Sequence, residues 1–108
     1  MTVKVANMAS MRSGREVPNQ FVIHTDNGIY FQSYDSVIAF VDDNYNITLG
    51  KYFDYSVTTS KYLHQFLKIY AGHTMHIMEK GIPSYKSFSD FLTKGIENGI
   101  IKYDEDME

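Results

Sequence analysis

The stretch QFVIHTDNGIYFQS, residues 20–33, decides the fold because two strand-like runs in it flank a short polar segment. Residues 20–25 and 29–33 are rich in β-branched and aromatic side chains, which favour extended backbone. The tripeptide DNG between them is typical of a tight hairpin turn. Asn27 and Gly28 both tolerate the positive φ angles of a type I′ turn. The stretch therefore predicts an antiparallel β-hairpin.

Further segments of the N-terminal half extend this hairpin into a sheet. Residues 2–6 alternate between polar and apolar side chains, as a half-buried strand does. Residues 36–41 and 45–49 form a second hairpin candidate around the polar turn 42–44, and Gly50 is a suitable end for the last strand. We expect an antiparallel sheet of four to five strands.

The C-terminal half has the periodicity of helices. Thr58, Thr59 and Ser60 are suitable N-caps, and Gly72 is a suitable end. Between them the apolar side chains recur on one helical stripe. The members of this stripe are Tyr62, Leu63, Phe66, Leu67 and Tyr70.

Another helix is expected after Pro83 and Ser84, ending so that Gly99 takes the C′ position. Its apolar face consists of Tyr85, Phe88, Phe91, Leu92 and Ile96. Residues 73–80 leave two alternatives, a short helix that ends at Gly81 or an irregular crossing, and we favour the helix. Strands first and helices afterwards predict an α+β fold in which two or three helices cover the sheet.

The composition fits a single domain over residues 1–108, with a short acidic tail at residues 104–108. The absence of cysteine excludes disulfides, thiolate metal sites and thiol nucleophiles, and it fits a reducing compartment. No apolar run is long enough for a signal peptide or a membrane span, since the longest covers residues 37–41. We expect a cytoplasmic protein without a membrane partner.

Charge is distributed unevenly along the chain. Residues 21–60 contain five acids against Lys51, a net charge of −4, whereas residues 61–103 contain six lysines against three acids, a net charge of +3. The sheet half is therefore expected to present an acidic surface. Such a surface disfavours a phosphate backbone and favours a basic partner.

The sequence has no pattern of a catalytic or metal site. It lacks a Gly-x-Ser-x-Gly motif, and its glycines are too scattered for a phosphate-binding loop. His73, His76 and Glu79 could align on one side of a helix, but zinc sites need further converging ligands. We expect no metal, no cofactor and no enzymatic activity.

The hydroxyl cluster Ser56, Thr58, Thr59 and Ser60 allows two interpretations. The start of a helix with spare N–H groups and hydroxyls can hold a phosphate or a carboxylate. Capping of the helix explains the same residues, and we favour it.

The tyrosines of the acidic segment are the strongest candidates for a functional surface. Aromatic residues make up 15% of the chain, more than one sheet and a few short helices need inside. Tyrosine beside acidic residues suits the recognition of a basic protein. We call the predicted partner-binding set the acidic tyrosine surface: Tyr30, Tyr34, Asp42, Asp43, Tyr45, Tyr52, Asp54 and Tyr55.

A family resemblance adds to this interpretation. The segments MASMRSGREVPNQFVI, FQSYDSVIAF and FDYSVTTSKYLHQFL, between Met8 and Leu67, resemble a largely uncharacterised family of short proteins from phages and mobile elements of Gram-positive bacteria. The segment LTKGIENGIIKY is similar to their closing helix and tail, whereas residues 71–85 depart from the pattern. The resemblance implies no catalytic residues. Small acidic proteins of this origin include anti-CRISPR inhibitors of type II systems.

We therefore expect a non-enzymatic accessory protein in the cytoplasm of a bacterial host. The expected function is inhibition of a host defence protein with a basic surface, such as a Cas9-type nuclease or its guide-RNA complex. The alternative is a nucleic-acid-binding accessory or regulatory protein that uses Lys4, Arg12 and Arg15 with the lysines of residues 61–103. That half contains no arginine, which leaves little capacity to read bases.

Overall fold

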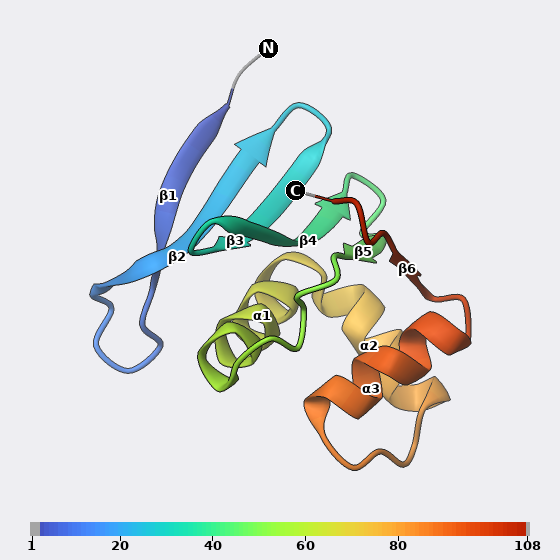
Figure 1. Cartoon of the computed structure of the whole chain (residues 1–108). Helices are drawn as coiled ribbons and strands as arrows, with labels where there is room; N and C mark the ends of the chain where they lie inside the picture. Colours follow the sequence, from blue (N-terminus) through green and yellow to red (C-terminus); the bar gives the residue numbers. More distant parts are fainter. Residues whose placement is uncertain (1–2, 108) are drawn as a thin grey trace.

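The structure is a computed structural model that describes residues 3–107, and it is a six-stranded sheet with three helices packed on one face (Figure 1). The α+β class and the division into a strand half and a helical half are as predicted. The elements are β1 (Lys4–Ala9), β2 (Glu16–Thr25), β3 (Gly28–Ser33), β4 (Ser36–Asp42), β5 (Ile47–Leu49), α1 (Val57–Tyr70), α2 (Gly72–Gly81), α3 (Phe88–Glu97) and β6 (Ile101–Tyr103).

The strands lie in the sheet in the order in which they occur in the sequence. Each strand from β1 to β5 is antiparallel to its neighbour, whereas β6 pairs with β5 in parallel. A parallel pair needs a long crossover connection, and the three helices supply it. The sequence did not predict β6, because a strand of three residues is too short to show an alternating pattern.

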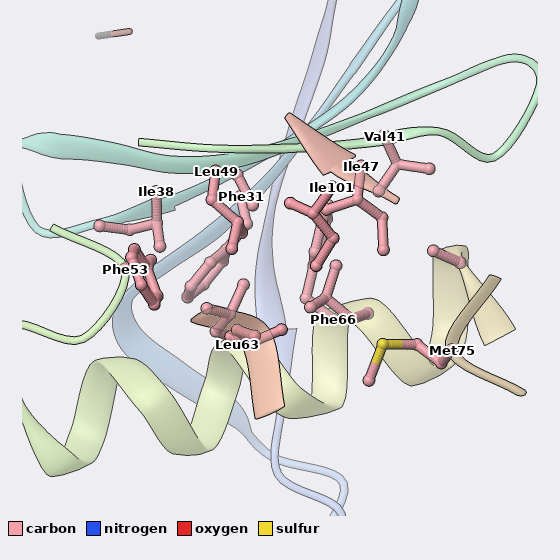
Figure 2. Packing of buried hydrophobic residues seen from close by; sticks show 14 of the residues in the cluster. Phe31, Ile38, Val41, Ile47, Leu49, Phe53, Leu63, Phe66, Met75 and Ile101 are labelled. Carbon is pink, nitrogen blue, oxygen red and sulfur yellow. The ribbon is translucent and has the colours of Figure 1, made fainter. Parts of the chain in front are cut away.

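The core lies between the sheet and the helices (Figure 2). Alternate residues of the strands point to opposite faces, and one face carries Phe31, Val41, Ile47 and other fully buried apolar side chains. Leu63 and Phe66 of α1 approach this face from the helical layer. The short strand β6 adds Ile101, which is also buried.

Three helix boundaries differ from the predicted ones. Ser56 caps α1 in place of the later hydroxyl residues, because its backbone is extended and its side chain accepts a hydrogen bond from the Thr59 N–H. The helix expected to end at Gly72 ends at Tyr70, and Gly72 is the first residue of α2, Gly72–Gly81, which is the helix we favoured for residues 73–80. Tyr85 lies outside α3, whose N-cap is Ser87.

The two hairpin turns are also built differently from the prediction. Gly28 has a φ of +151° and pairs with Thr25, and Asn27 is not among the residues of positive φ, so the type I′ assignment was wrong. In the second hairpin Tyr45 has a φ of +66° and lies in the turn, and β5 begins only at Ile47. Both turns still connect the strands that the sequence predicted.

We expect Gly28→Ala to lower the free energy of unfolding by about 2–4 kcal/mol. A Cβ at this position would overlap the carbonyl oxygen of Val41 and lie 2.8 Å from the ring of Phe40, on a backbone that side chains rarely adopt. The matched variant Asn27→Ala changes an exposed turn residue without positive φ and should cost less than about 0.5 kcal/mol. Chemical denaturation of both variants tests this, and equal stability would contradict it.

Candidate functional site

A pocket of about 630 Å³ lies where the β3–β4 turn meets the loop before α1 and the first turn of that helix. We call it the tyrosine pocket. Three tyrosines, one acid, a set of hydroxyl residues and one isoleucine line it. They are Ser33, Tyr34, Asp35, Ser36, Ile38, Tyr52, Tyr55, Ser56, Thr58 and Thr59.

The rims of the tyrosine pocket are exposed aromatic rings. Tyr34, Tyr52 and Tyr55 have exposed fractions of 54%, 41% and 74%. The rings of Tyr52 and Tyr55 meet edge to face with centroids 5.7 Å apart. Because each ring restricts the motion of the other, these exposed rings can contact a partner with little further loss of side-chain conformational entropy.

Tyr34 keeps an unfavourable backbone conformation at the pocket. Its φ is +54°, a left-handed value that costs a tyrosine roughly 1 kcal/mol or more. Hydrogen bonds hold this conformation, since the Tyr34 N–H donates to the Asn19 carbonyl at 2.7 Å and its carbonyl accepts from Gln32 Nε2 at 2.8 Å. The turn therefore directs a large ring to a place where glycine would be the easier residue.

The floor of the pocket is a network of hydroxyls. The side-chain oxygens of Ser33 and Thr59, both buried, lie 2.9 Å apart. Ser56 Oγ donates to Thr59 Oγ1 and accepts from the Thr59 N–H, each at 3.1 Å. The favoured capping interpretation of the hydroxyl cluster is confirmed for Ser56. The same hydroxyls also make the floor polar, and Ser60 does not line the pocket.

A buried polar side chain lies behind this floor. Gln20 is opposite Ser33 in the β2–β3 ladder and is fully buried. Within residues 3–107, neither its Nε2 nor its Oε1 has a hydrogen-bond partner. An unpaired buried amide costs on the order of 1–3 kcal/mol, so the structure gives up stability beside the pocket.

The charged groups around the pocket favour a cation. Asp35 is the one acid among the lining residues, which include no lysine, arginine or histidine. The Asp35 carboxylate is exposed, and in the described part of the chain it has no hydrogen bond or ion pair. The Lys51 ammonium lies 5.1 Å from the centroid of the Tyr52 ring, so one face of this ring already attracts a cation.

The structure divides the predicted acidic tyrosine surface into separate parts. Of its eight residues, only Tyr34, Tyr52 and Tyr55 line the pocket. Tyr30 packs on Phe40 with ring centroids 4.5 Å apart, on the sheet face opposite the helices. The remaining members do not line the pocket: Asp54 accepts from Ser89 Oγ at 3.4 Å, and Asp42, Asp43 and Tyr45 lie at the β4–β5 turn.

Asp42 holds the β4–β5 turn together. Its Oδ1 accepts the N–H groups of Asn44 and Asn46 at 2.9 Å each, and its Oδ2 accepts from Asn46 Nδ2 at 3.2 Å. The hydrogen bond from the Asn46 N–H is the main reason that the pKa of Asp42 lies below its ordinary value. Asp42 is thus a structural residue of this turn, and a charge reversal there would destabilise the turn.

Asp35 and the serines on either side of its turn were not among the residues predicted from the sequence. Ser33 and Ser36 pair with one another at the ends of β3 and β4, with Tyr34 and Asp35 as the two residues between them. A tyrosine and an acid in so short a turn must both protrude, which is the signal that could have identified them.

The histidines do not gather into a metal site. His73, His76 and Glu79 all lie on α2, as the favoured helix requires. Across residues 3–107, no group of three or more histidine or acidic residues could hold a metal ion. In the same residues, no helix is long and apolar enough to cross a membrane.

We expect Gln20→Met to raise the free energy of unfolding by about 1–2 kcal/mol, because methionine has a similar shape and no hydrogen bonds to satisfy. Gln32→Met is the control, since Gln32 is hydrogen-bonded to the Tyr34 carbonyl and its replacement should not stabilise. Thermal unfolding of both variants measures the difference. An unchanged or lower stability of Gln20→Met would show that the buried amide does not reduce the free energy of unfolding.

We expect Asp42→Asn to destabilise the protein by roughly 1 kcal/mol near neutral pH, with solvent screening keeping the loss small. The lowered pKa means that this stabilisation is present above the ordinary aspartate pKa and is lost as the pH falls through the folded-state pKa. The stability difference from wild type should therefore shrink in acid. Asp43→Asn, which removes a neighbouring exposed charge, should have no such effect.

Comparison with known proteins places the chain in a family. No curated protein and no solved structure matches it. The model of a family of unknown function, DUF8033, matches residues 3–88, which include the whole tyrosine pocket. The protein therefore belongs to this family of unknown function, DUF8033.

Proposed function

We propose that this protein is a non-enzymatic binding protein that holds a basic side chain of a partner protein in the tyrosine pocket. The observation that carries the proposal is the convergence of Tyr34, Tyr52 and Tyr55 with Asp35 on one pocket that has no basic lining residue. Tyrosine faces attract lysine and arginine by the cation–π interaction, and a carboxylate adds an ion pair.

An anionic ligand fits this pocket less well. The start of α1 has a partial positive charge, which favours anions. However, Ser56 Oγ already accepts the Thr59 N–H, and Asp35 would repel a phosphate or a carboxylate. The Lys51 ammonium lies over the Tyr52 ring, but Lys51 is not among the lining residues.

The partner that the proposal tests first is a host defence protein. The segments between Met8 and Leu67 that resemble short phage and mobile-element proteins make a Cas9-type nuclease, alone or with its guide RNA, the first target. Such a nuclease has a basic channel for nucleic acid, and occupation of this channel would inhibit it. The match to the DUF8033 family neither supports nor opposes an origin in phages or mobile elements.

The test uses an arginine-rich peptide and a purified Cas9-type nuclease as probes. Tyr34→Gly should weaken binding by on the order of tenfold, because it removes one ring that faces the cation. Its stability should stay within about 1 kcal/mol of wild type, because glycine accepts a positive φ without strain. Asp35→Asn should weaken binding and reduce its salt dependence.

Two controls make this experiment specific. Asp43→Asn removes the same charge outside the pocket and should bind like wild type. Lys51→Gln removes the cation that already lies on Tyr52 and should strengthen binding of the peptide. Wild-type affinity for both probes in Tyr34→Gly and Asp35→Asn would reject the pocket as the binding site. If only the nuclease fails to bind, another basic protein is the partner.

A further inference from the structure

A second pocket, of about 260 Å³, lies between the β1–β2 loop and the exposed side of α1. We call it the basic pocket. Three cationic residues and one histidine line it, together with polar and apolar side chains. The lining residues are Ser10, Met11, Arg12, Lys61, Tyr62, His64, Gln65, Lys68 and Ile69.

The cations of the basic pocket are not neutralised by acids. Its lining includes Arg12, Lys61 and Lys68 but no aspartate or glutamate. Among residues 3–107 the one ion pair is between Lys94 and Asp90, so none of these three cations is in a salt bridge. Lys61 instead lies over the ring of Tyr62, with its Nζ 5.3 Å from the centroid. The pocket therefore has a positive field of its own in a chain whose net charge is −3.

The histidine that lines the basic pocket has a lowered pKa. Burial lowers the pKa of His64, and the positive charge of Lys68 lowers it further, while Glu79 acts in the opposite direction. The His64 ring stacks on Phe88 with centroids 4.3 Å apart, which fixes its position next to α3.

The two sides of the basic pocket are joined by hydrogen bonds. Ser10 Oγ accepts the N–H groups of Arg12 and Ser13, at 3.2 and 3.4 Å, so the loop that carries Arg12 is folded on itself. Gln65 Nε2 of α1 donates to the Ala9 carbonyl at 2.7 Å and ties the helix to this loop. Arg12 therefore approaches the lysines of α1 within a defined structure rather than on a free end.

We propose that the basic pocket binds a phosphate group, with Arg12 on the loop side and Lys61 and Lys68 on the helix side. Phosphate suits this arrangement better than carboxylate does, because its several oxygens can accept from cations that converge from two sides. The planar guanidinium of Arg12 also matches phosphate with two parallel hydrogen bonds. The group can come from a nucleic-acid backbone or from free phosphate.

This site is independent of the tyrosine pocket. The two pockets share no lining residue, and their charged residues have opposite signs. A test of phosphate binding therefore does not depend on whether the tyrosine pocket binds the proposed protein partner.

The experiment follows amide resonances of the isotope-labelled protein with inorganic phosphate and, separately, with a short oligothymidine. Both titrations should be saturable and should shift the loop around Arg12 and the exposed side of α1. The double variant Arg12→Gln with Lys68→Gln should weaken binding by on the order of tenfold and reduce its salt dependence. Lys102 lies on β6 beside Ile101 and points to the opposite face of the sheet, so Lys102→Gln removes one positive charge outside the pocket and should bind like wild type.

The two probes also identify the source of the phosphate. Tighter binding of oligothymidine at equal phosphate concentration supports the site and assigns it to a nucleic-acid backbone. Equal or tighter binding of inorganic phosphate supports the site and assigns it to a free phosphate. Absence of saturable shifts with both probes, or wild-type binding by the double variant, overturns the proposal. Wild-type thermal unfolding of the double variant confirms that any lost binding is not a loss of fold.

Discussion

The stack of Phe31 on Phe66 fixes where α1 lies on the sheet, and the tyrosine pocket depends on that placement. Both rings are fully buried, and their centroids are 5.5 Å apart. Ser33 follows Phe31 on the same face of β3, and Thr59 precedes Phe66 by about two helical turns on the same stripe. Once the rings stack, these two hydroxyls meet at 2.9 Å and close the pocket floor.

Helix α1 contributes to two pockets of opposite charge. The net charge of the chain reveals neither of them. Its first turn brings Thr58 and Thr59 to the pocket that contains Asp35, whereas Lys61 and Lys68 lie on the basic pocket. Counted along the sequence, the net charge is −4 over residues 21–60 and +3 over residues 61–103. The fold instead brings Arg12 from the strand half to the lysines of the helical half, so the local field is set by tertiary structure.

Local patterns in the sequence were sufficient for most of the fold but for only part of the site. The strands around Asn27 and the glycine C′ position of α3 follow from short-range preferences, and Gly99 has the expected positive φ of +77°. The strand β6 could not be predicted, because its pairing with β5 spans the whole helical region. Tyr34 and Tyr52 were identified by composition, but their meeting with Asp35 depends on how β3, β4 and α1 pack.

Two unfavourable features lie beside the tyrosine pocket, and their position supports a functional site there. Tyr34 keeps a left-handed backbone, and Gln20 has an unpaired buried amide behind Ser33. A sequence selected for stability alone would have glycine at position 34 and an apolar residue at position 20. Proteins retain such costs most often where binding requires a particular side chain, and the hydrophobic core around Phe31 and Phe66 is what tolerates them.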